Sequence, residues 1–220
     1  MGSQVNKPAS RSYSSPVRAE QARLTERRIT DAAHRLFLAQ GYGQTTLATV
    51  AREAGVSAQT IHNVFGTKPA LLKKVHDLAL VGDDEPIPMA DRPEVQRMMR
   101  ERDPARLIAD WSRFTAAIAR RLAPLYEVLI VAADGDPEVA LLWAVSEENR
   151  TGGARSFTTV LDAIGGLRPD LPIDRATAIA EILMDPMPCR RLVLDAGWTV
   201  EEYASYLERM ARAAFLPRSR

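Results

Sequence analysis

A short polar face lies between residues 57 and 63, where small, hydroxyl, imidazole and amide side chains surround one apolar position. Its members are Ser57, Ala58, Gln59, Thr60, His62 and Asn63. An amide side chain can form two hydrogen bonds with the edge of an adenine, and small neighbours allow the close approach that this requires. These residue types therefore favour hydrogen bonding to base edges in a DNA groove.

The surrounding sequence predicts two short helices joined by a tight turn over residues 46–65. The apolar residues of the first helix recur at helical spacing: Leu47, Val50, Ala51 and Ala54. Thr46 and Ser57 precede the two helices as N-caps, and Gly55 can end the first helix in a left-handed conformation. The inner face of the second helix is predicted to be Ile61, Val64 and Phe65. This arrangement is typical of a helix-turn-helix, whose second helix enters the major groove.

Residues 23–83 resemble the DNA-binding domain of the TetR (tetracycline repressor) family of bacterial transcriptional regulators. The resemblance rests on the spacing F-x3-G-Y-x2-T-T-x3-V-A-x2-A-G-V-S-x7-F-x2-K-x2-L-L, which starts at Phe37. The sequence departs from the family pattern at His62 and Asn63, where the family commonly has an aromatic residue followed by tyrosine or histidine. It also has Pro69 at a commonly acidic position, in the first turn of a helix, where proline is tolerated.

Phosphate contacts are expected at both ends of the motif. Gln44, Thr45 and Thr46 lead into its first helix, and hydroxyl and N–H groups at a helix start favour phosphate. The family resemblance implies a further phosphate contact from Lys68. The helix that Lys68 begins, predicted over 68–81 after a Thr67 cap, corresponds in the family to the connection between DNA reader and body.

The charge distribution agrees with a polyanion partner at the N-terminal end. The net charge is +1, but residues 1–80 carry 11 basic and 5 acidic side chains, while residues 81–220 carry 18 basic and 23 acidic ones. Residues 1–19 are predicted to be a flexible basic arm that either enters a minor groove or is an untethered leader. A non-specific nucleoid binder would need a far more basic chain.

Composition narrows the location and excludes several chemistries. Cys189 is the only cysteine, so no internal disulfide can form, and no secretory leader or run of 18 apolar residues is present. We expect a cytoplasmic protein without a membrane span. The motifs H-E-x-x-H, C-x-x-C and G-x-S-x-G are absent, and Glu147 and Glu148 are adjacent and so point to different sides of a helix. We expect no enzyme activity, cofactor or metal.

The rest of the chain predicts an all-α protein of about nine to eleven helices. Residues 20–83 form the DNA-binding domain, beginning with a helix over 20–40 that Gly41 ends, and residues 84–220 form a helical ligand-binding and dimerisation domain. Pro104 is expected to start a helix that ends near Leu122, and Pro124 to open another. Gly152 and Gly153 either interrupt the helix that follows or allow another group to approach closely.

The second domain has two predicted tasks. By resemblance to the family, helices over 175–183 and 199–215 form a four-helix bundle in a homodimer, although their apolar faces can also fill the core of one subunit. An apolar pocket between helices can hold a small-molecule effector, and its candidate lining residues are Trp111, Phe114, Tyr126, Trp143 and Phe157. Each of these also fits plain core packing. Glu147, Glu148, Arg150 and Arg155 can orient a polar ligand group or lie in solvent.

The predicted function is that of a dimeric regulator, most readily a repressor, which a small molecule releases from a palindromic double-stranded DNA operator. The alternative is a helical small-molecule-binding protein whose DNA-reading motif is vestigial. The polar face of the second motif helix, next to Lys68 and the basic N-terminal part, favours the first hypothesis.

Overall fold

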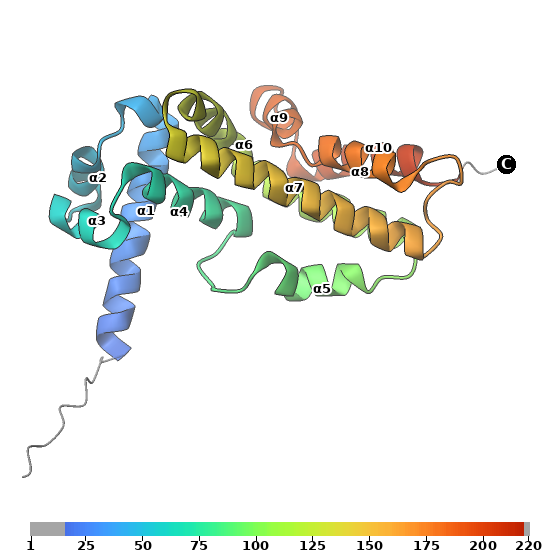
Figure 1. Ribbon diagram of the computed structural model, residues 1–220, viewed down its shortest axis with the longest axis horizontal. Helices are drawn as coiled ribbons and strands as arrows, with labels where there is room; N and C mark the ends of the chain where they lie inside the picture. The colour runs from blue at the N-terminus through green and yellow to red at the C-terminus, as the bar shows by residue number, and fades with distance from the viewer. Residues whose placement is uncertain (1–15, 218–220) are drawn as a thin grey trace, which may run out of the picture.

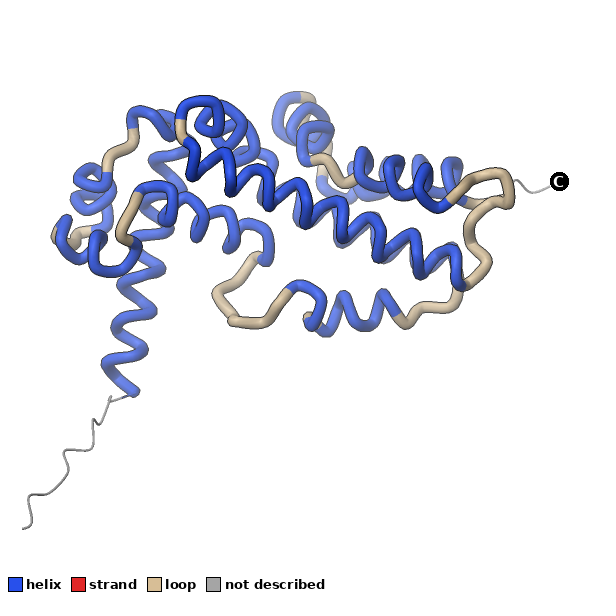
Figure 2. The backbone as a smooth tube through the Cα atoms, viewed as in Figure 1, coloured by secondary structure: helices blue, strands red, loops and turns tan. Residues whose placement is uncertain are grey.

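The computed structural model describes residues 16–217, which form helices, turns and loops without a strand (Figures 1 and 2). The predicted all-α fold is confirmed. The helices are α1 (Pro16–Gln44), α2 (Leu47–Ala54), α3 (Ala58–Phe65), α4 (Lys68–Val81), the 3-10 helix η1 (Met89–Asp91), α5 (Pro93–Met99), α6 (Pro104–Gly135), α7 (Pro137–Ala163), α8 (Ile173–Leu183), α9 (Pro186–Cys189), the π-helix η2 (Arg190–Asp195) and α10 (Val200–Phe215).

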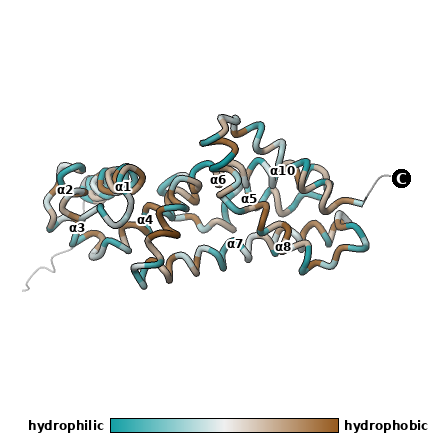
Figure 3. Tube along the Cα trace, turned by 90° about the horizontal axis from the view of Figure 1, so that it is seen from above, coloured by the Kyte–Doolittle hydropathy of each residue, from teal (hydrophilic) through white to brown (hydrophobic). Residues whose placement is uncertain are grey.

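Helices α1 to α4 lie at one end of an elongated molecule, with the C-terminus at the other end (Figures 1 and 3). The first helix begins at Pro16, four residues before its predicted start, and residues 1–15 of the predicted arm lie outside the described residues. Gly41 leaves the helical conformation with φ 79° and ψ 169°, so it ends the regular part of α1 as predicted. Residues 42–44 then return to helical conformation.

One apolar core joins the N-terminal helices to the body. Ile29, Phe37 and Leu71 from α1 and α4 pack in the same cluster as Leu125 and Leu129 from α6, and all five are fully buried. Val139 and Leu142 at the start of α7 also belong to this cluster. The apolar core is therefore continuous across the boundary predicted after residue 83.

The chain between α4 and α5 is held by two arginines. The Arg121 side chain donates to the carbonyl oxygens of Ala79 and Leu80 at 2.8 and 3.0 Å, at the C-terminal end of α4. Arg92 is buried and donates to both carboxylate oxygens of Asp83 at 2.7 and 2.8 Å. Both contacts fix the path of the chain as it leaves α4.

The predicted helix break at Pro124 is wrong, because α6 runs without interruption from Pro104 to Gly135. A proline inside a helix costs about 3 kcal/mol. Leu122, Ala123, Leu125 and Tyr126 on both sides of it are buried. Each large side chain among them contributes roughly 1.5–3 kcal/mol of burial, which is enough to keep the helix continuous.

Helix α7 is also continuous through Gly152 and Gly153. A Cβ atom on Gly153 would lie 3.2 Å from the Met184 Cε atom, whereas one on Gly152 would meet nothing within 4 Å. Of the two predicted roles, close approach therefore applies to Gly153. Helix α8 ends at Leu183, and Asp185 caps the short helix α9.

Two further cores stabilise the body. One lies far from the N-terminal helices. It contains side chains of α5, α6, α7, α8 and α10, and its largest are Trp111, Phe157 and Phe215. The other lies between α6, α9, η2 and α10 around Tyr203 and the buried Cys189. Burial raises the pKa of the Cys189 thiol to about 11, so this cysteine is a small buried residue rather than a reactive thiol.

Candidate functional site

The predicted helix-turn-helix has the local geometry that its capping residues imply. The Thr46 hydroxyl accepts from the Thr49 N–H at 3.1 Å, and the Thr49 hydroxyl accepts from the Thr46 N–H at 3.0 Å. Gly55 ends α2 with φ 66°, and the Ser57 hydroxyl accepts from the Thr60 N–H at 3.0 Å to begin α3. These caps satisfy helix-end groups locally, which leaves the outer face of α3 free.

The outward face of α3 presents the predicted base-reading residues. Ser57, Ala58, Gln59, His62 and Asn63 are exposed, and Thr60 is half-buried. Gln59 donates to the Asn63 side-chain oxygen at 2.8 Å, and the Ser57 and Thr60 hydroxyl oxygens lie 2.8 Å apart. The face therefore holds oriented amide and hydroxyl groups that can exchange these partners for base edges.

Two side chains of the motif lie elsewhere than predicted. Thr45 is fully buried, and its hydroxyl donates to the Gly41 carbonyl oxygen at 2.8 Å, so the hydroxyl holds the turn and does not point to solvent. Val64 was expected on the inner face of α3 but is 45% exposed. Ile61 alone is fully buried on this two-turn helix, because a helix this short can direct only one narrow stripe into the core.

The remaining predicted phosphate contacts lie beside α3. Gln44 and Thr46 are exposed. Lys68 is half-buried: its Nζ atom donates to the Tyr42 carbonyl oxygen at 3.0 Å and lies 3.9 Å from the centre of the Tyr42 ring. The free form thus holds the Lys68 ammonium group close to the turn between α1 and α2.

Tyr42 also connects the N-terminal helices α1–α4 (the reader) to the rest of the molecule (the body). The sequence did not indicate this contact. Its hydroxyl donates to an Asp136 carboxylate oxygen at 2.7 Å, and Asp136 is the N-cap of α7. This hydrogen bond lowers the pKa of Asp136, while burial and the same bond raise the pKa of Tyr42. Both shifts keep the donor and acceptor in the states that form the bond. Residues 94 positions apart carry no local pattern that could have predicted it.

Arg28 makes a second contact that the sequence did not predict. Arg28 is exposed on α1, and its Nη2 atom donates to the Ala54 carbonyl oxygen at 2.5 Å. Arg35, which follows Arg28 on the same helix, instead pairs with Glu53 at 3.0 Å on the surface. The two arginines therefore connect α1 to α2 in different ways.

The predicted effector-lining aromatics do not meet in one place. Trp111 and Phe157 stack at 4.2 Å between ring centres and are buried in the core far from the reader, against which Phe114 also packs. Tyr126 and Trp143 form a separate pair at 4.7 Å. The sequence supplied the residue types, but their pairing depends on which helices become neighbours.

A polar network surrounds Tyr126. Its hydroxyl donates to a Glu147 carboxylate oxygen at 2.7 Å and accepts from Arg150 at 3.0 Å, and Arg150 also pairs with Glu147 and with Asp185. Burial and the Glu147 acceptor raise the pKa of Tyr126, so it remains a donor. Glu148 is exposed, and Arg155 pairs with Asp174 at the surface. Glu147 and Arg150 are thus the charged candidates that meet an aromatic side chain.

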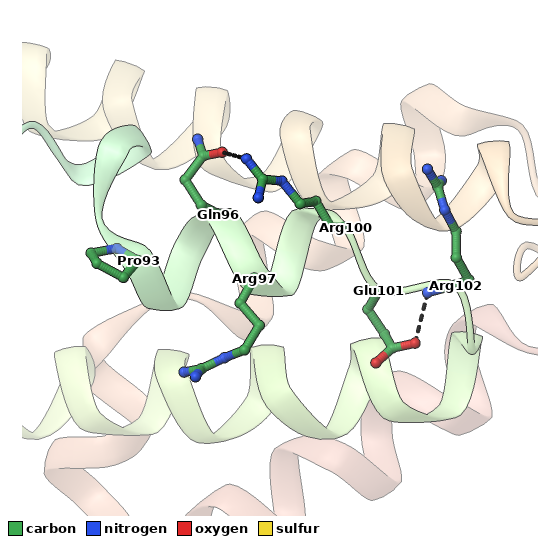
Figure 4. A pocket seen from close by; sticks show the side chains of 6 residues that line it. All are labelled: Pro93, Gln96, Arg97, Arg100, Glu101 and Arg102. Carbon is green, nitrogen blue, oxygen red and sulfur yellow. Dashed lines mark hydrogen bonds between the residues drawn. The ribbon is translucent and has the colours of Figure 1, made fainter.

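Two clefts are open to solvent. One of about 520 Å³ is lined by Pro93, Gln96, Arg97, Arg100, Glu101 and Arg102, whose guanidinium groups point apart (Figure 4). The other, of about 680 Å³, lies between the two parts of the molecule and is lined by Tyr42, Lys68, Val131 and Asp136 among others. Neither cleft includes one of the five predicted effector-lining aromatics.

The C-terminal helices α8 and α10 each expose one large apolar side chain. Ile182 of α8 is 69% exposed and Met210 of α10 is 39% exposed. Among the described residues, no helix is long and apolar enough to cross a membrane.

Comparison with known proteins agrees with the helix-turn-helix assignment. Residues 29–75, from α1 to α4, match the sequence model of the family described as "Bacterial regulatory proteins, tetR family". No curated protein sequence matches the chain.

Solved structures share the fold over most of the chain. A protein of Saccharomonospora viridis, solved in complex with choline, is 18% identical with a TM-score of 0.66, covering 89% of this chain and 100% of its own. NalD of Pseudomonas aeruginosa, the secondary repressor of the MexAB-OprM multidrug efflux pump, is 17% identical with a TM-score of 0.64, covering 89% and 98%. A TetR transcription regulator of Haloarcula marismortui is 17% identical with a TM-score of 0.63, covering 88% and 99%. At these identities the likeness establishes the fold.

Proposed function

We propose that this chain, a DNA-binding transcriptional regulator of the TetR family, is a repressor that binds a near-palindromic operator as a homodimer and leaves it when a small molecule binds. The observation that carries the proposal is the exposed, hydrogen-bonded polar face of α3. A vestigial reader would have no need to keep oriented amide and hydroxyl groups free of the core. NalD, which has the same fold, is a repressor.

The proposed dimer uses α8 and α10. A two-fold dimer places two recognition helices about 34 Å apart, which matches successive major grooves on one face of DNA. Ile182 and Met210 are the apolar side chains that such a bundle would cover. We place the dimer interface on these helices for that reason.

The proposed effector site lies beside Tyr126 and Trp143. Two aromatic rings lie next to a group in which Arg150 pairs with two carboxylates, Glu147 and Asp185. The excess negative charge and the aromatic faces suit a positively charged small molecule through charge attraction and cation–π contact. The Saccharomonospora viridis structure with this fold holds choline, so choline is the first probe. Trp111, Phe114 and Phe157 are left out of the proposed site, because they belong to the distal core.

The proposed release mechanism acts through contacts between body and reader. Arg121 holds the C-terminal end of α4, and Asp136 holds Tyr42 beside Lys68. An effector that binds one arrangement of α6 and α7 more tightly shifts the population toward it. The reader would follow because these contacts and the shared core move with the two helices.

Selection from random-sequence DNA tests the DNA-binding half. We expect the protein to enrich one short palindrome and to bind it as a dimer with strongly salt-dependent affinity. A gel shift with a scrambled duplex of equal length is the control. Equal binding to both duplexes would reject sequence-specific regulation and support the vestigial-reader alternative.

Calorimetry with choline tests the effector half separately. We expect choline to bind the protein, and Glu147→Gln to weaken that binding about tenfold or more, because it removes a carboxylate next to the ligand charge. Glu148→Gln, on the exposed side of the same helix, is the matched control. Choline binding that is indifferent to both changes would place the site elsewhere.

A further inference from the structure

We propose that Arg28 of α1 positions the recognition helix by holding the turn between α2 and α3, and that this contact determines how well the protein separates its operator from other DNA. The inference rests on the DNA-binding half of the proposed function. It assigns Arg28 a role that differs from a phosphate contact or a solvated face.

The contact supplies a donor where α2 lacks one. The last carbonyl groups of a helix have no partner within it. In α2 the Ala51 carbonyl accepts from the N–H groups of Gly55 and Val56, and within residues 16–217 the Ala54 and Gly55 carbonyls have no backbone donor. Arg28 Nη2 donates to these two oxygens at 2.5 and 3.3 Å. Its positive charge also lies at the negative end of α2, where a cation is stabilising.

The glycine of the turn makes room for this contact. Gly55 has φ 66°, and a Cβ atom at this position would lie 3.0 Å from Arg28 Nη2. A side chain would therefore strain the backbone and displace the guanidinium group. The turn needs glycine both for its conformation and for the arginine that holds it.

Hydrogen bonds on both sides of the turn between α2 and α3 restrict its movement. The Val56 N–H donates to the Ala51 carbonyl oxygen at 3.0 Å, and the Ser57 hydroxyl caps α3. Gln59 and Thr60 follow in the first turn of α3, where base contacts are made. A shift at Ala54 or Gly55 is therefore passed on to the base-reading side chains.

Arg35 provides a matched comparison within the same pair of helices. Both arginines are exposed and both connect α1 to α2, but Arg35 pairs with the Glu53 side chain at 3.0 Å and not with the carbonyl groups of the turn. Surface pairs of this kind contribute little. The difference between Arg28 and Arg35 therefore isolates the hold on the turn from a general link between the helices.

The experiment compares four full-length proteins: wild type, Arg28→Ala, Arg28→Lys and Arg35→Ala. Each is titrated with the palindrome that wild type selects from random DNA and with a scrambled duplex, over a range of salt concentrations. We expect Arg28→Ala to lose about tenfold or more in palindrome affinity because misplaced base contacts are lost. Scrambled-duplex affinity should change by about twofold or less and the salt slope should stay the same. Arg28→Lys, which keeps a donor, should recover part of the discrimination, and Arg35→Ala should behave as wild type.

Two results would overturn the proposal. A salt slope reduced by about one in Arg28→Ala, with equal losses on both duplexes, would make Arg28 a phosphate contact. Unchanged discrimination would show that the turn needs no such hold.

Amide hydrogen exchange in the DNA-free proteins separates this inference from the proposed function. We expect faster exchange at Val56 and Thr60 in Arg28→Ala and not in Arg35→Ala, at a temperature where circular dichroism shows both to be folded. Equal exchange rates in the two variants would reject the hold on the turn. Failure of wild type to select a sequence would reject the proposed function and leave the exchange result to decide the role of the contact.

Discussion

The half-buried Thr60 of α3 allows a test of whether this helix enters the DNA groove. Thr60 lies in the first turn of α3, with its hydroxyl beside Ser57. A tryptophan at this position would keep the Ser57 cap, which uses the backbone N–H of residue 60, but would keep the helix out of the groove. We expect Thr60→Trp to weaken operator binding about 100-fold, because each recognition helix of the proposed dimer loses base contacts.

Gel shift and size-exclusion chromatography measure the two parts of this prediction. The proposed dimer should remain intact, because Thr60 is far from α8 and α10. Glu94→Trp, an exposed position on α5, controls for the addition of a bulky surface residue. Operator affinity unchanged by Thr60→Trp would mean that α3 does not face the groove as proposed.

The ion pair between Asp83 and Arg92 makes the stability of the fold depend on pH. The hydrogen bonds from Arg92 lower the pKa of the Asp83 carboxyl from 3.8 to about 2. Because the folded pKa is lowered, the pair stabilises the fold above about pH 4, and this contribution is lost as the pH falls toward about 2. We expect Asp83→Asn to be less stable than wild type at pH 5 and to approach wild type at pH 2.5. Urea unfolding at both values measures it, and a difference that stays constant would contradict the assignment.

At the scale of elements, local chemistry predicted helix ends well. The expected caps at Thr46, Ser57 and Thr67 are all present, because a cap depends on neighbours within a few residues. Pro124 was misread for the opposite reason. Its cost is local, but the burial that offsets it comes from helices far away in the sequence.

The two adjacent glycines of α7 allow a test of helix propensity in place. Both lie inside the helix, and only Gly153 is close to another side chain, Met184. We expect Gly152→Ala to stabilise the protein by about 0.5–1 kcal/mol, since alanine loses less conformational entropy on helix formation. Gly153→Ala should gain less, because Met184 must move. Thermal unfolding compares the two, and destabilisation by Gly152→Ala would indicate that this face is covered by a partner.

Candidate site residues were predictable where the motif is local and not where it depends on packing. The outward face of α3 follows from helical spacing. The burial of Thr45 and the hold of Arg28 on Ala54 follow from how α1 crosses α2, which no spacing rule describes. The aromatic side chains that were predicted to line an effector pocket form two separate groups for the same reason.

At the scale of the whole molecule, the shared core makes the reader dependent on the body. Leu125 and Leu129 of α6 pack with the N-terminal helices, and each buried leucine contributes roughly 1.5–3 kcal/mol. We expect a fragment of residues 16–83 to be unfolded or marginally stable at 25 °C, and Leu129→Ala in the full chain to cost about 2–5 kcal/mol.

Circular dichroism and urea unfolding measure both changes. Leu141→Ala, at a position 66% exposed on α7, is the control and should be close to neutral. A fragment that unfolds cooperatively with the stability of the full chain would mean that the N-terminal helices need no support from α6 and α7.

The same core bears on how regulators of this kind can be recombined. A reader transplanted from a relative at residue 83 would bring the right bases to recognise, but its apolar underside would meet side chains selected for another partner. The exchangeable unit is therefore α1–α4 together with the tip of the α6–α7 hairpin around Leu129 and Val139. Chimeras cut to include that tip should inherit the operator preference of one parent and the proposed effector response of the other, whereas chimeras cut in the loop should inherit neither.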